Sequence, residues 1–226
     1  MGKFKGIVFD LDGTLVHSDV NFTKMKENMI KVLEKHGTPK SVLTPKMTTV
    51  VIMEHAEKYW TEHRKTEAKR KWLREEMTRL MDSGEMEAIE TLKPISGVKE
   101  AIRRLKKKGY LLGILTRSHH AYAVEALKKM EMLDYFEAVL GREETPQPKP
   151  YAEAMIYSAK ALGLQLDEVF LVGDHHIDST CAVNAGCHFI GVATGLRGDL
   201  SWEINRPKVI LPSVADLPEY LEENDR

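Results

Sequence analysis

The stretch Phe9–Leu15 reads Phe-Asp-Leu-Asp-Gly-Thr-Leu, and it continues the apolar run Gly6–Phe9. A compact apolar run that includes β-branched residues is typical of a short buried β-strand. Asp10 therefore stands where this strand is expected to end, and Asp12 lies just beyond it in a turn that Gly13 permits. Because ligands of open parallel sheets bind at the carboxyl ends of the strands, this pair of carboxylates indicates a functional site.

Further runs of the same kind follow along the chain and alternate with segments whose apolar residues have helical spacing. The expected strands after the first are 111–115, 138–140, 169–172 and 189–192, with a shorter sixth at 209–211. The expected helices between them are 98–107, 120–130, 152–162 and 177–185. Alternating strands and helices with short connections predict an α/β fold, in which helices cover both faces of a parallel sheet.

The segment 21–92 interrupts this alternation, because it contains no strand-like run. Its apolar residues recur at helical spacing, as in Met25, Met29, Val32 and Leu33 and again in Leu73, Met77, Leu80 and Met81. We expect three or four amphipathic helices here, inserted into the α/β part as a lid. The predicted organisation is an α/β core domain of residues 1–16 plus 93–226 and an all-helical cap domain of residues 17–92.

The composition and charge of the chain exclude several classes of function. Its 226 residues carry a formal net charge of -1, so no global positive field favours nucleic acid or an anionic membrane. No apolar stretch approaches the roughly 20 residues that a membrane span needs. The two cysteines are too few for a disulfide framework, and Asp10 and Asp12 interrupt the first apolar run too early for a secretory signal. We therefore expect a cytoplasmic protein that binds neither nucleic acid nor membrane.

Cationic side chains gather in two clusters. The first, at 103–108, ends an expected helix, where cations complement the carbonyl end of the helix dipole. The second, at 64–74, lies in the lid and alternates with glutamates. Two interpretations of the second cluster remain open, a solvated face of the lid and a surface for an anionic substrate.

Polar residues follow two other expected strands at the point where each strand ends. Thr116 comes directly after the run 113–115, and Asp174 comes directly after the run 171–173. One Asp or Thr at such a position is commonly a helix cap. Three strand ends that each carry a residue suited to phosphate or metal chemistry, with a carboxylate pair at the first, indicate an active site.

These residues suit the steps of phosphoryl transfer, which depends mainly on positioning and charge stabilisation. The Asp10 carboxylate can attack phosphorus to form an acyl phosphate, and Asp12 can protonate the leaving oxygen and later activate water. A hard divalent cation, of which Mg²⁺ fits best, would screen the repulsion between Asp10 and an anionic substrate. Asp174 can supply another ligand, and Asp178 can face the same way if a helix begins there.

Three residues are candidates for binding the phosphate group of a substrate. Thr116 offers a hydroxyl at the point where the backbone turns into the next expected helix, whose first amides would point at an anion. Arg117 follows directly and suits either the phosphate or the lid. Lys149 lies between two prolines and is therefore a cation on a stiffened loop.

In their order along the chain, these motifs resemble those of the haloacid dehalogenase-like hydrolase superfamily. The residues that carry the resemblance are Asp10–Leu15, Thr116, Lys149 and Gly173–Asp178. The resemblance spans essentially the whole chain, including the helical insertion between the first and second motifs. It implies a Rossmann-like parallel-sheet core with an inserted all-helical cap domain.

The resemblance also implies a role for each matching residue. Asp10 would be the nucleophile, Asp12 the acid and base, and Thr116 and Lys149 the phosphate binders. The implied cofactor is Mg²⁺, and its implied ligands are Asp10, the backbone carbonyl of Asp12, Asp174 and, in support, Asp178.

The presence of Asp12 separates branches of this family. Dehalogenase members lack an acid/base Asp at its position, because a halide leaves without a proton. The resemblance therefore implies a Mg²⁺-dependent phosphatase of the phosphoglycolate-phosphatase-like kind, which hydrolyses a small phosphorylated metabolite. Two alternatives stay open, a phosphomutase that uses the same phospho-aspartate and a non-catalytic regulator that binds phosphorylated ligands.

Histidines near the motifs depart from the family's usual pattern. His17 stands where relatives often carry an Asp, so it can contact the substrate or be an ordinary residue of the lid's connection. His175 and His176 follow Asp174, where small hydroxyl residues are common in the family. An adjacent pair can hold a second metal ion or have no special role.

Overall fold

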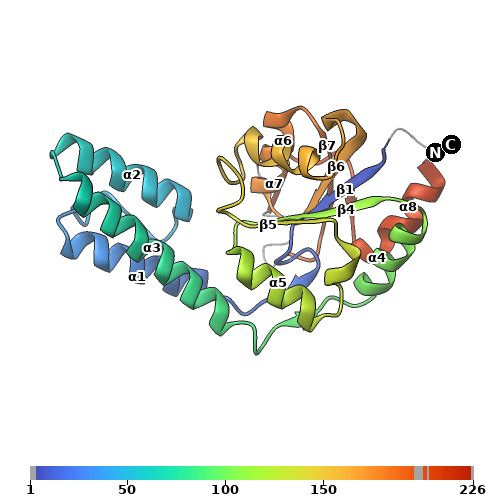
Figure 1. The fold of residues 1–226 in the computed structure, drawn as a ribbon, viewed down its shortest axis with the longest axis horizontal. Helices are drawn as coiled ribbons and strands as arrows, with labels where there is room; N and C mark the ends of the chain where they lie inside the picture. The colour runs from blue at the N-terminus through green and yellow to red at the C-terminus, as the bar shows by residue number, and fades with distance from the viewer. Residues whose placement is uncertain (1–3, 196–200, 203, 225–226) are drawn as a thin grey trace. The chain divides into compact units, whose positions relative to one another are not determined.

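The first apolar run forms a buried strand, β1 (Gly6–Phe9), in the computed structural model, which describes residues 4–195, 201–202 and 204–224. Among these residues, six strands form one sheet in the order β5-β4-β1-β6-β7-β8, and every pair in it is parallel (Figure 1). The other strands are β4 (Leu111–Leu115), β5 (Ala138–Leu140), β6 (Val169–Gly173), β7 (His188–Val192) and β8 (Ile210–Leu211). Burial on both faces explains why β1 and β6 are continuously apolar rather than alternating.

The order of the strands reverses beside β1. From β1 the chain builds outward to β4 and β5 on one side, and it then crosses to β6, β7 and β8 on the other side. Phe9 of β1 is level with Ile114 of β4 and with Val172 of β6. The residues that follow these strands therefore meet at one edge of the sheet, at the switch point where ligands of such sheets bind.

Helices cover both faces of the sheet, with α6 and α7 on one face and α4, α5 and α8 on the other (Figure 1). Their bounds are α4 (Val98–Lys107), α5 (His120–Lys129), α6 (Ala152–Ala161), α7 (His176–Ala185) and α8 (Leu217–Asn224). Short 3-10 helices occur at Leu133–Tyr135, Leu166–Glu168 and Val214–Asp216. Under α6 and α7, the strand residues Val8 and Leu171 pack with Met155 and Cys181 in a common apolar core. The predicted α/β fold is confirmed.

The inserted segment forms a compact helical unit of its own, Asp19–Ala88. Within it, all of which is described, three helices occur: α1 (Phe22–Lys35), α2 (Thr49–Glu62) and α3 (Glu67–Glu87). Their buried faces carry the residues whose helical spacing predicted them, such as Met29 and Leu33 of α1 and Leu73 and Met77 of α3. The buried Ile52, Ala56 and Trp60 of α2 complete this small core.

The core unit consists of Met1–Ser18 and Ile89–Arg226, so the helical unit is shorter than the expected 17–92. The physical reason is a short antiparallel ribbon, in which β2 (Val16–His17) pairs with β3 (Lys93–Pro94). This ribbon pairs the segment that leads into the helical unit with the segment that returns from it, and both segments belong to the core unit. No helix in the described part of the chain has the length and apolar composition needed to cross a membrane.

Candidate active site

Three carboxylates from separate elements meet at the carboxyl edge of the sheet. Asp10 directly follows β1, Asp174 directly follows β6, and Asp178 lies in the first turn of α7. All three are buried, and one carboxylate oxygen of each lies within 4.8 Å of the corresponding oxygens of the other two. Repulsion between like charges in such a site is large unless a cation compensates it, so the surroundings of these groups decide what the site can do.

Lys149 reaches the carboxylates from the loop before α6. Its Nζ donates to Asp10 Oδ1 and to Asp178 Oδ1, each at 2.6 Å, and its side chain is only 1% exposed. Burial alone would lower the pKa of Lys149, but the charges of Asp10 and Asp178 raise this pKa above its ordinary value. The lysine is therefore a permanent buried cation at neutral pH, rather than a surface residue on a proline-stiffened loop.

The turn after β1 and the loop after β7 hold Asp174 in place. Thr14 Oγ1 donates to Asp174 Oδ1 at 3.2 Å. Gly13 has a φ of +84°, and a Cβ at this position would lie 2.6 Å from Asp174 Oδ2. A Cβ on Gly195 would overlap the same oxygen, and Thr194 Oγ1 fixes the approach by donating to the Gly13 carbonyl at 2.6 Å. Only glycine allows these two backbones so close to the carboxylate.

Sequence reasoning missed Thr194 and Gly195. Thr194 comes two residues after the end of β7, whereas Thr116 directly follows β4, so a search for polar residues directly after a strand did not find it. What the sequence could not show is that this loop packs against Asp174, because the contact joins segments far apart in the chain.

Burial changes the proton affinity of the clustered carboxylates. It raises the pKa of Asp10 to about 6, with a further rise from the charge of Asp178 and an opposing effect of Lys149. Burial, followed by the charges of Asp10 and Asp178, also raises the pKa of Asp174 well above its ordinary value. Both groups therefore bind protons more tightly in the folded protein than in the unfolded chain.

This difference predicts how the stability of the metal-free protein depends on pH. The pKa of these acids is raised in the folded state. Their favourable contribution to the free energy of unfolding is therefore complete below pH 4 and is lost as the pH rises through about 6. We expect the free energy of unfolding in EDTA to fall by about 2 kcal/mol over this range. Urea unfolding at several pH values measures it, with Asp174→Asn as the matched variant, whose pH dependence should be weaker. Equal slopes for both proteins would contradict this prediction.

Asp12 has surroundings of a different kind. Tyr122 Oη donates to its Oδ1 at 2.5 Å, and Ser118 Oγ donates to its Oδ2 at 3.1 Å. Burial raises the pKa of Asp12, while hydrogen bonds from Tyr122 and Ser18 act in the opposite direction. The two aspartates of the first motif are therefore divided between two environments, Asp10 beside a lysine and Asp12 among hydroxyl groups. Such a division suits separate roles for two neighbouring carboxylates.

The turn after β4 follows the strand that neighbours β1 in the sheet. Thr116 is buried, and its Oγ1 accepts a hydrogen bond from the Ser118 amide at 3.0 Å. Arg117 lies between them, and its carbonyl accepts a hydrogen bond from Arg142 Nη1 at 3.2 Å. Thr116 and Arg117 therefore lie in the loop that leads into the N-terminus of α5.

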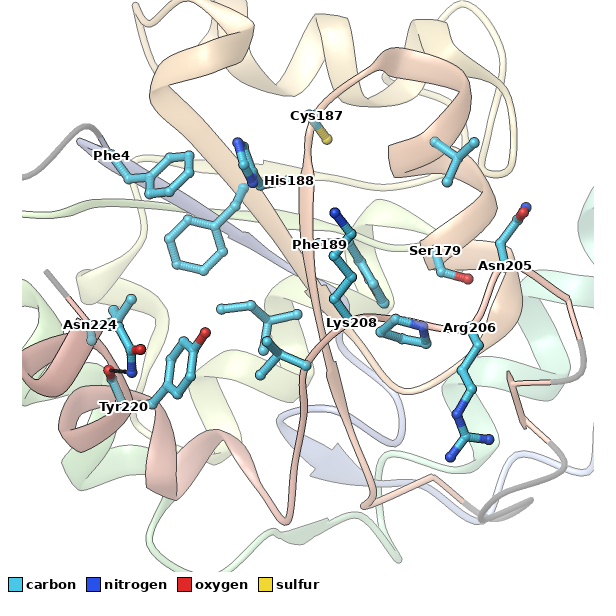
Figure 2. A pocket seen from close by; sticks show the side chains of 16 residues that line it. Phe4, Ser179, Cys187, His188, Phe189, Asn205, Arg206, Lys208, Tyr220 and Asn224 are labelled. Atoms are coloured by element: carbon cyan, nitrogen blue, oxygen red, sulfur yellow. Dashed lines mark hydrogen bonds between the residues drawn. The ribbon is translucent and has the colours of Figure 1, made fainter.

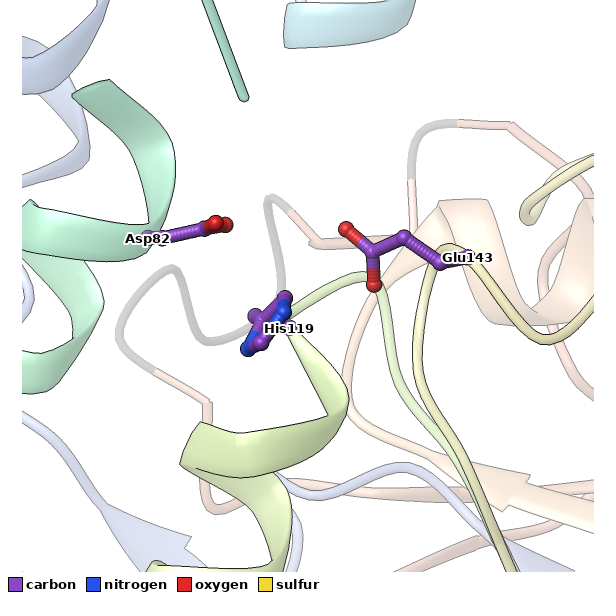
Figure 3. A group of neighbouring side chains, drawn as sticks. All are labelled: Asp82, His119 and Glu143. Carbon is purple, nitrogen blue, oxygen red and sulfur yellow. The ribbon is translucent and has the colours of Figure 1, made fainter. Parts of the chain in front are cut away.

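The histidines near the motifs make local backbone contacts. His175 caps α7, because its Nδ1 accepts a hydrogen bond from the Ile177 amide at 3.3 Å. The rings of His175 and His176 lie 4.1 Å apart. His119 caps α5 in the same way, and Figure 3 shows it at the start of this helix and Glu143 on the loop after β5.

A further hollow in the core unit lies away from these residues. A cavity of about 910 Å³ is lined by residues of α7, β7, α8 and the segment before β8, among them Val183, Phe189, Lys208 and Tyr220 (Figure 2). No residue predicted for the site lines it. The candidate chemistry therefore belongs to the strand ends and not to this cavity.

Known proteins match this chain over almost its whole length. Phosphoglycolate phosphatase of Neisseria meningitidis is 27% identical over 222 residues, which cover 96% of this chain and 94% of that protein. Phosphoglycolate phosphatase of Escherichia coli is 26% identical over 236 residues, which cover 96% of this chain and 93% of that protein.

Solved structures show the same fold. A predicted phosphoglycolate phosphatase from Haemophilus somnus superposes with a TM-score of 0.64 at 24% identity, over 97% of this chain and 99% of that one. A hydrolase from Pseudomonas syringae superposes with a TM-score of 0.67 at 20% identity, over 98% of this chain and 100% of that one.

The family itself follows from a profile that covers most of the chain. The profile described as haloacid dehalogenase-like hydrolase matches residues 7–192, which include every residue predicted for the site. The resemblance found in the sequence is therefore confirmed. This chain belongs to the haloacid dehalogenase-like hydrolases.

Proposed function

We propose that this protein is a Mg²⁺-dependent phosphatase that hydrolyses a small phosphorylated metabolite through a phospho-aspartate at Asp10. The observation that carries this proposal is the position of the Asp10 carboxylate. It lies at the end of the central strand, is paired with the buried Lys149, and is grouped with Asp174 and Asp178. Asp12 lies next to it in the chain but in separate surroundings, as an acid and base should.

The carboxylate cluster fits a divalent cation. Asp10, Asp174 and Asp178 are three buried acids in contact with one lysine, so the group has an excess of negative charge when ionised. Hard oxygen ligands at this spacing suit Mg²⁺. The residues that would hold it are Asp10, Asp174 and the backbone carbonyl of Asp12. Asp178 would act in support, because its oxygens already accept from Lys149 and from the His175 amide.

In the first half of the reaction, an oxygen of Asp10 attacks phosphorus and forms an acyl phosphate as the bond to the leaving oxygen breaks. Lys149 orients Asp10 and, with the Thr116 hydroxyl and the amides that start α5, balances the charge of the phosphate. Asp12 transfers its proton to the leaving oxygen. A bound Mg²⁺ would supply further charge neutralisation between Asp10 and the phosphate.

In the second half, water attacks the phosphorus of the acyl phosphate. Asp12, now ionised, accepts a proton from this water as the new bond forms. The bond between phosphorus and Asp10 breaks, inorganic phosphate is released, and both aspartates return to their starting state. Arg117, directly after Thr116, would contact the phosphate or the part of the substrate beyond it.

The relatives support a small substrate, because proteins that are 26–27% identical to this chain are named phosphoglycolate phosphatases. A screen of phosphate release over phosphoglycolate, sugar phosphates, nucleotides and pyrophosphate tests the proposal. We expect release from at least one small phosphate ester. An isomerised product without free phosphate would indicate a phosphomutase instead, and no turnover of any compound would favour a regulator that only binds phosphorylated ligands.

Metal addition gives a prediction that does not depend on the substrate. Mg²⁺ added to EDTA-treated protein should raise the midpoint of thermal unfolding by about 5 °C near saturation, because it binds the folded cluster and not the unfolded chain. Asp174→Asn should lose most of this shift. Differential scanning fluorimetry measures both proteins. An equal shift in the variant would place the metal elsewhere, and no shift in either protein would contradict the metal site.

A further inference from the structure

Both oxygens of the Asp12 side chain are held by hydroxyl groups from the part of the chain around the start of α5. Tyr122 donates to Oδ1 at 2.5 Å, and Ser118 donates to Oδ2 at the longer distance of 3.1 Å. Tyr122 is 0% exposed, although a tyrosine ring is large and its hydroxyl is polar. A buried phenol is normally matched with a partner, and here that partner is the carboxylate proposed to move protons.

The helix that carries Tyr122 is fixed at its start. His119 Nδ1 accepts from the Ala121 amide at 3.2 Å, and the Arg142 amide donates to the Ser118 carbonyl at 3.1 Å. The loop after β5 packs so tightly here that a Cβ on Gly141 would lie 2.6 Å from the backbone nitrogen of residue 120. The Tyr122 hydroxyl is therefore a donor in a fixed position and not one that follows Asp12 as it moves.

We propose that Tyr122 is a positioning residue for Asp12, an inference that rests on the phosphatase function proposed above. A carboxyl group exchanges a proton through one oxygen at a time. Tyr122 engages Oδ1 by the shorter contact and turns the carboxyl plane, so that Oδ2 is the oxygen that serves the reaction. Ser118, at the longer distance, gives way when Oδ2 contacts the reacting oxygen.

The assignment gives a balanced sequence of proton transfers. In the first half, the bond between Oδ2 and its proton breaks, and the proton joins the leaving oxygen, which takes the electron pair of the broken bond to phosphorus. In the second half, Oδ2 accepts a proton from the attacking water, whose oxygen bonds to phosphorus. Tyr122 keeps its own proton throughout and touches neither substrate nor water.

Tyr122→Phe tests this inference, because it removes the hydroxyl and keeps the ring in its buried place. Two aryl phosphates serve as probes: phenyl phosphate, whose leaving oxygen needs a proton, and 2,4-dinitrophenyl phosphate, whose leaving phenolate does not. We expect kcat/KM for phenyl phosphate to fall about 10- to 100-fold and that for dinitrophenyl phosphate to fall less than about threefold. A merely structural role of Tyr122 would lower both values equally, and that result would overturn the inference.

A second comparison uses the Asp12→Asn background, with phenyl phosphate in single turnovers. If Tyr122 acts through Asp12, adding Tyr122→Phe to Asp12→Asn should cause no further loss. An additional loss of the size seen in the otherwise unchanged protein would show that Tyr122 acts independently of Asp12 and would overturn the inference. This comparison remains informative if Tyr122→Phe lowers stability. The rate of Asp12→Asn and that of the double variant are each divided by the folded fraction of the protein, which circular dichroism measures.

Two further variants complete the design. Tyr157→Phe, on the exposed face of α6, should leave both kcat/KM values unchanged. Ser118→Ala should change the ratio of kcat/KM for phenyl phosphate to kcat/KM for dinitrophenyl phosphate by less than about threefold, because Ser118 must release Asp12 Oδ2 during the reaction. A larger change in this ratio would overturn the assignment of Oδ2. If the unaltered protein releases no phosphate from either probe, the proposed function fails and not merely the role of Tyr122.

Discussion

Asp10→Asn should reduce phosphate release by about 10⁴-fold or more, because an amide cannot form the acyl phosphate. The side chain keeps its shape, and an Asn at this position can still accept a hydrogen bond from Lys149. We therefore expect an unchanged circular dichroism spectrum beside the lost activity. Acid-quenched protein examined by mass spectrometry during turnover should carry a phosphate adduct in the unaltered enzyme and none in the variant.

The matched control for this substitution is Asp134→Asn, in the short 3-10 helix Leu133–Tyr135 outside the site. It should retain full activity and the phosphate adduct. Undiminished phosphate release by Asp10→Asn would exclude the phospho-aspartate mechanism. A phosphate adduct that persists in this variant would move the nucleophile to another residue.

Lys149→Met should have the largest effect on stability, because it leaves Asp10 and Asp178 buried without their cation. Removing one partner of a buried ion pair destabilises a protein by about 3–5 kcal/mol, and activity should be lost as well. The loss of stability should shrink as the pH falls toward about 6, because the pKa of Asp10 rises further without Lys149 and a protonated Asp10 no longer needs the lysine. Urea unfolding in EDTA at neutral and at acidic pH measures both effects.

Lys160→Met, on the exposed side of α6, is the control and should change the free energy of unfolding by less than about 0.5 kcal/mol. A second check pairs Lys149→Met with Asp178→Asn, which removes one of the unpaired charges and should restore part of the stability. If Lys149→Met destabilises the protein no more than Lys160→Met at every pH, the ion pairs do not have the role that their geometry indicates.

Much of the fold could be predicted because its signals are local. A fully buried parallel strand must be apolar throughout, as in Gly6–Phe9, and a helix packed on one face must repeat its apolar residues every three or four positions, as in α1 and α3. The bounds of the inserted unit depend on a contact between segments that are far apart in the chain. The pairing of Val16–His17 with Lys93–Pro94 holds both connections to the helical unit within the core unit. Each of these two strands has only two residues, which is too short to show a periodic pattern in the sequence.

The sequence by itself determined which chemistry is present: an aspartate pair after the first strand, and a threonine, a lysine and two further aspartates placed in the order of one family. Tertiary structure alone decided how these groups act on one another. The contact of Lys149 with Asp10 spans 139 positions of the chain, and that of Tyr122 with Asp12 spans 110. Charge compensation and hydrogen bonding in a buried site depend on distances of a few ångströms, and only the packing of the strands and helices fixes these distances.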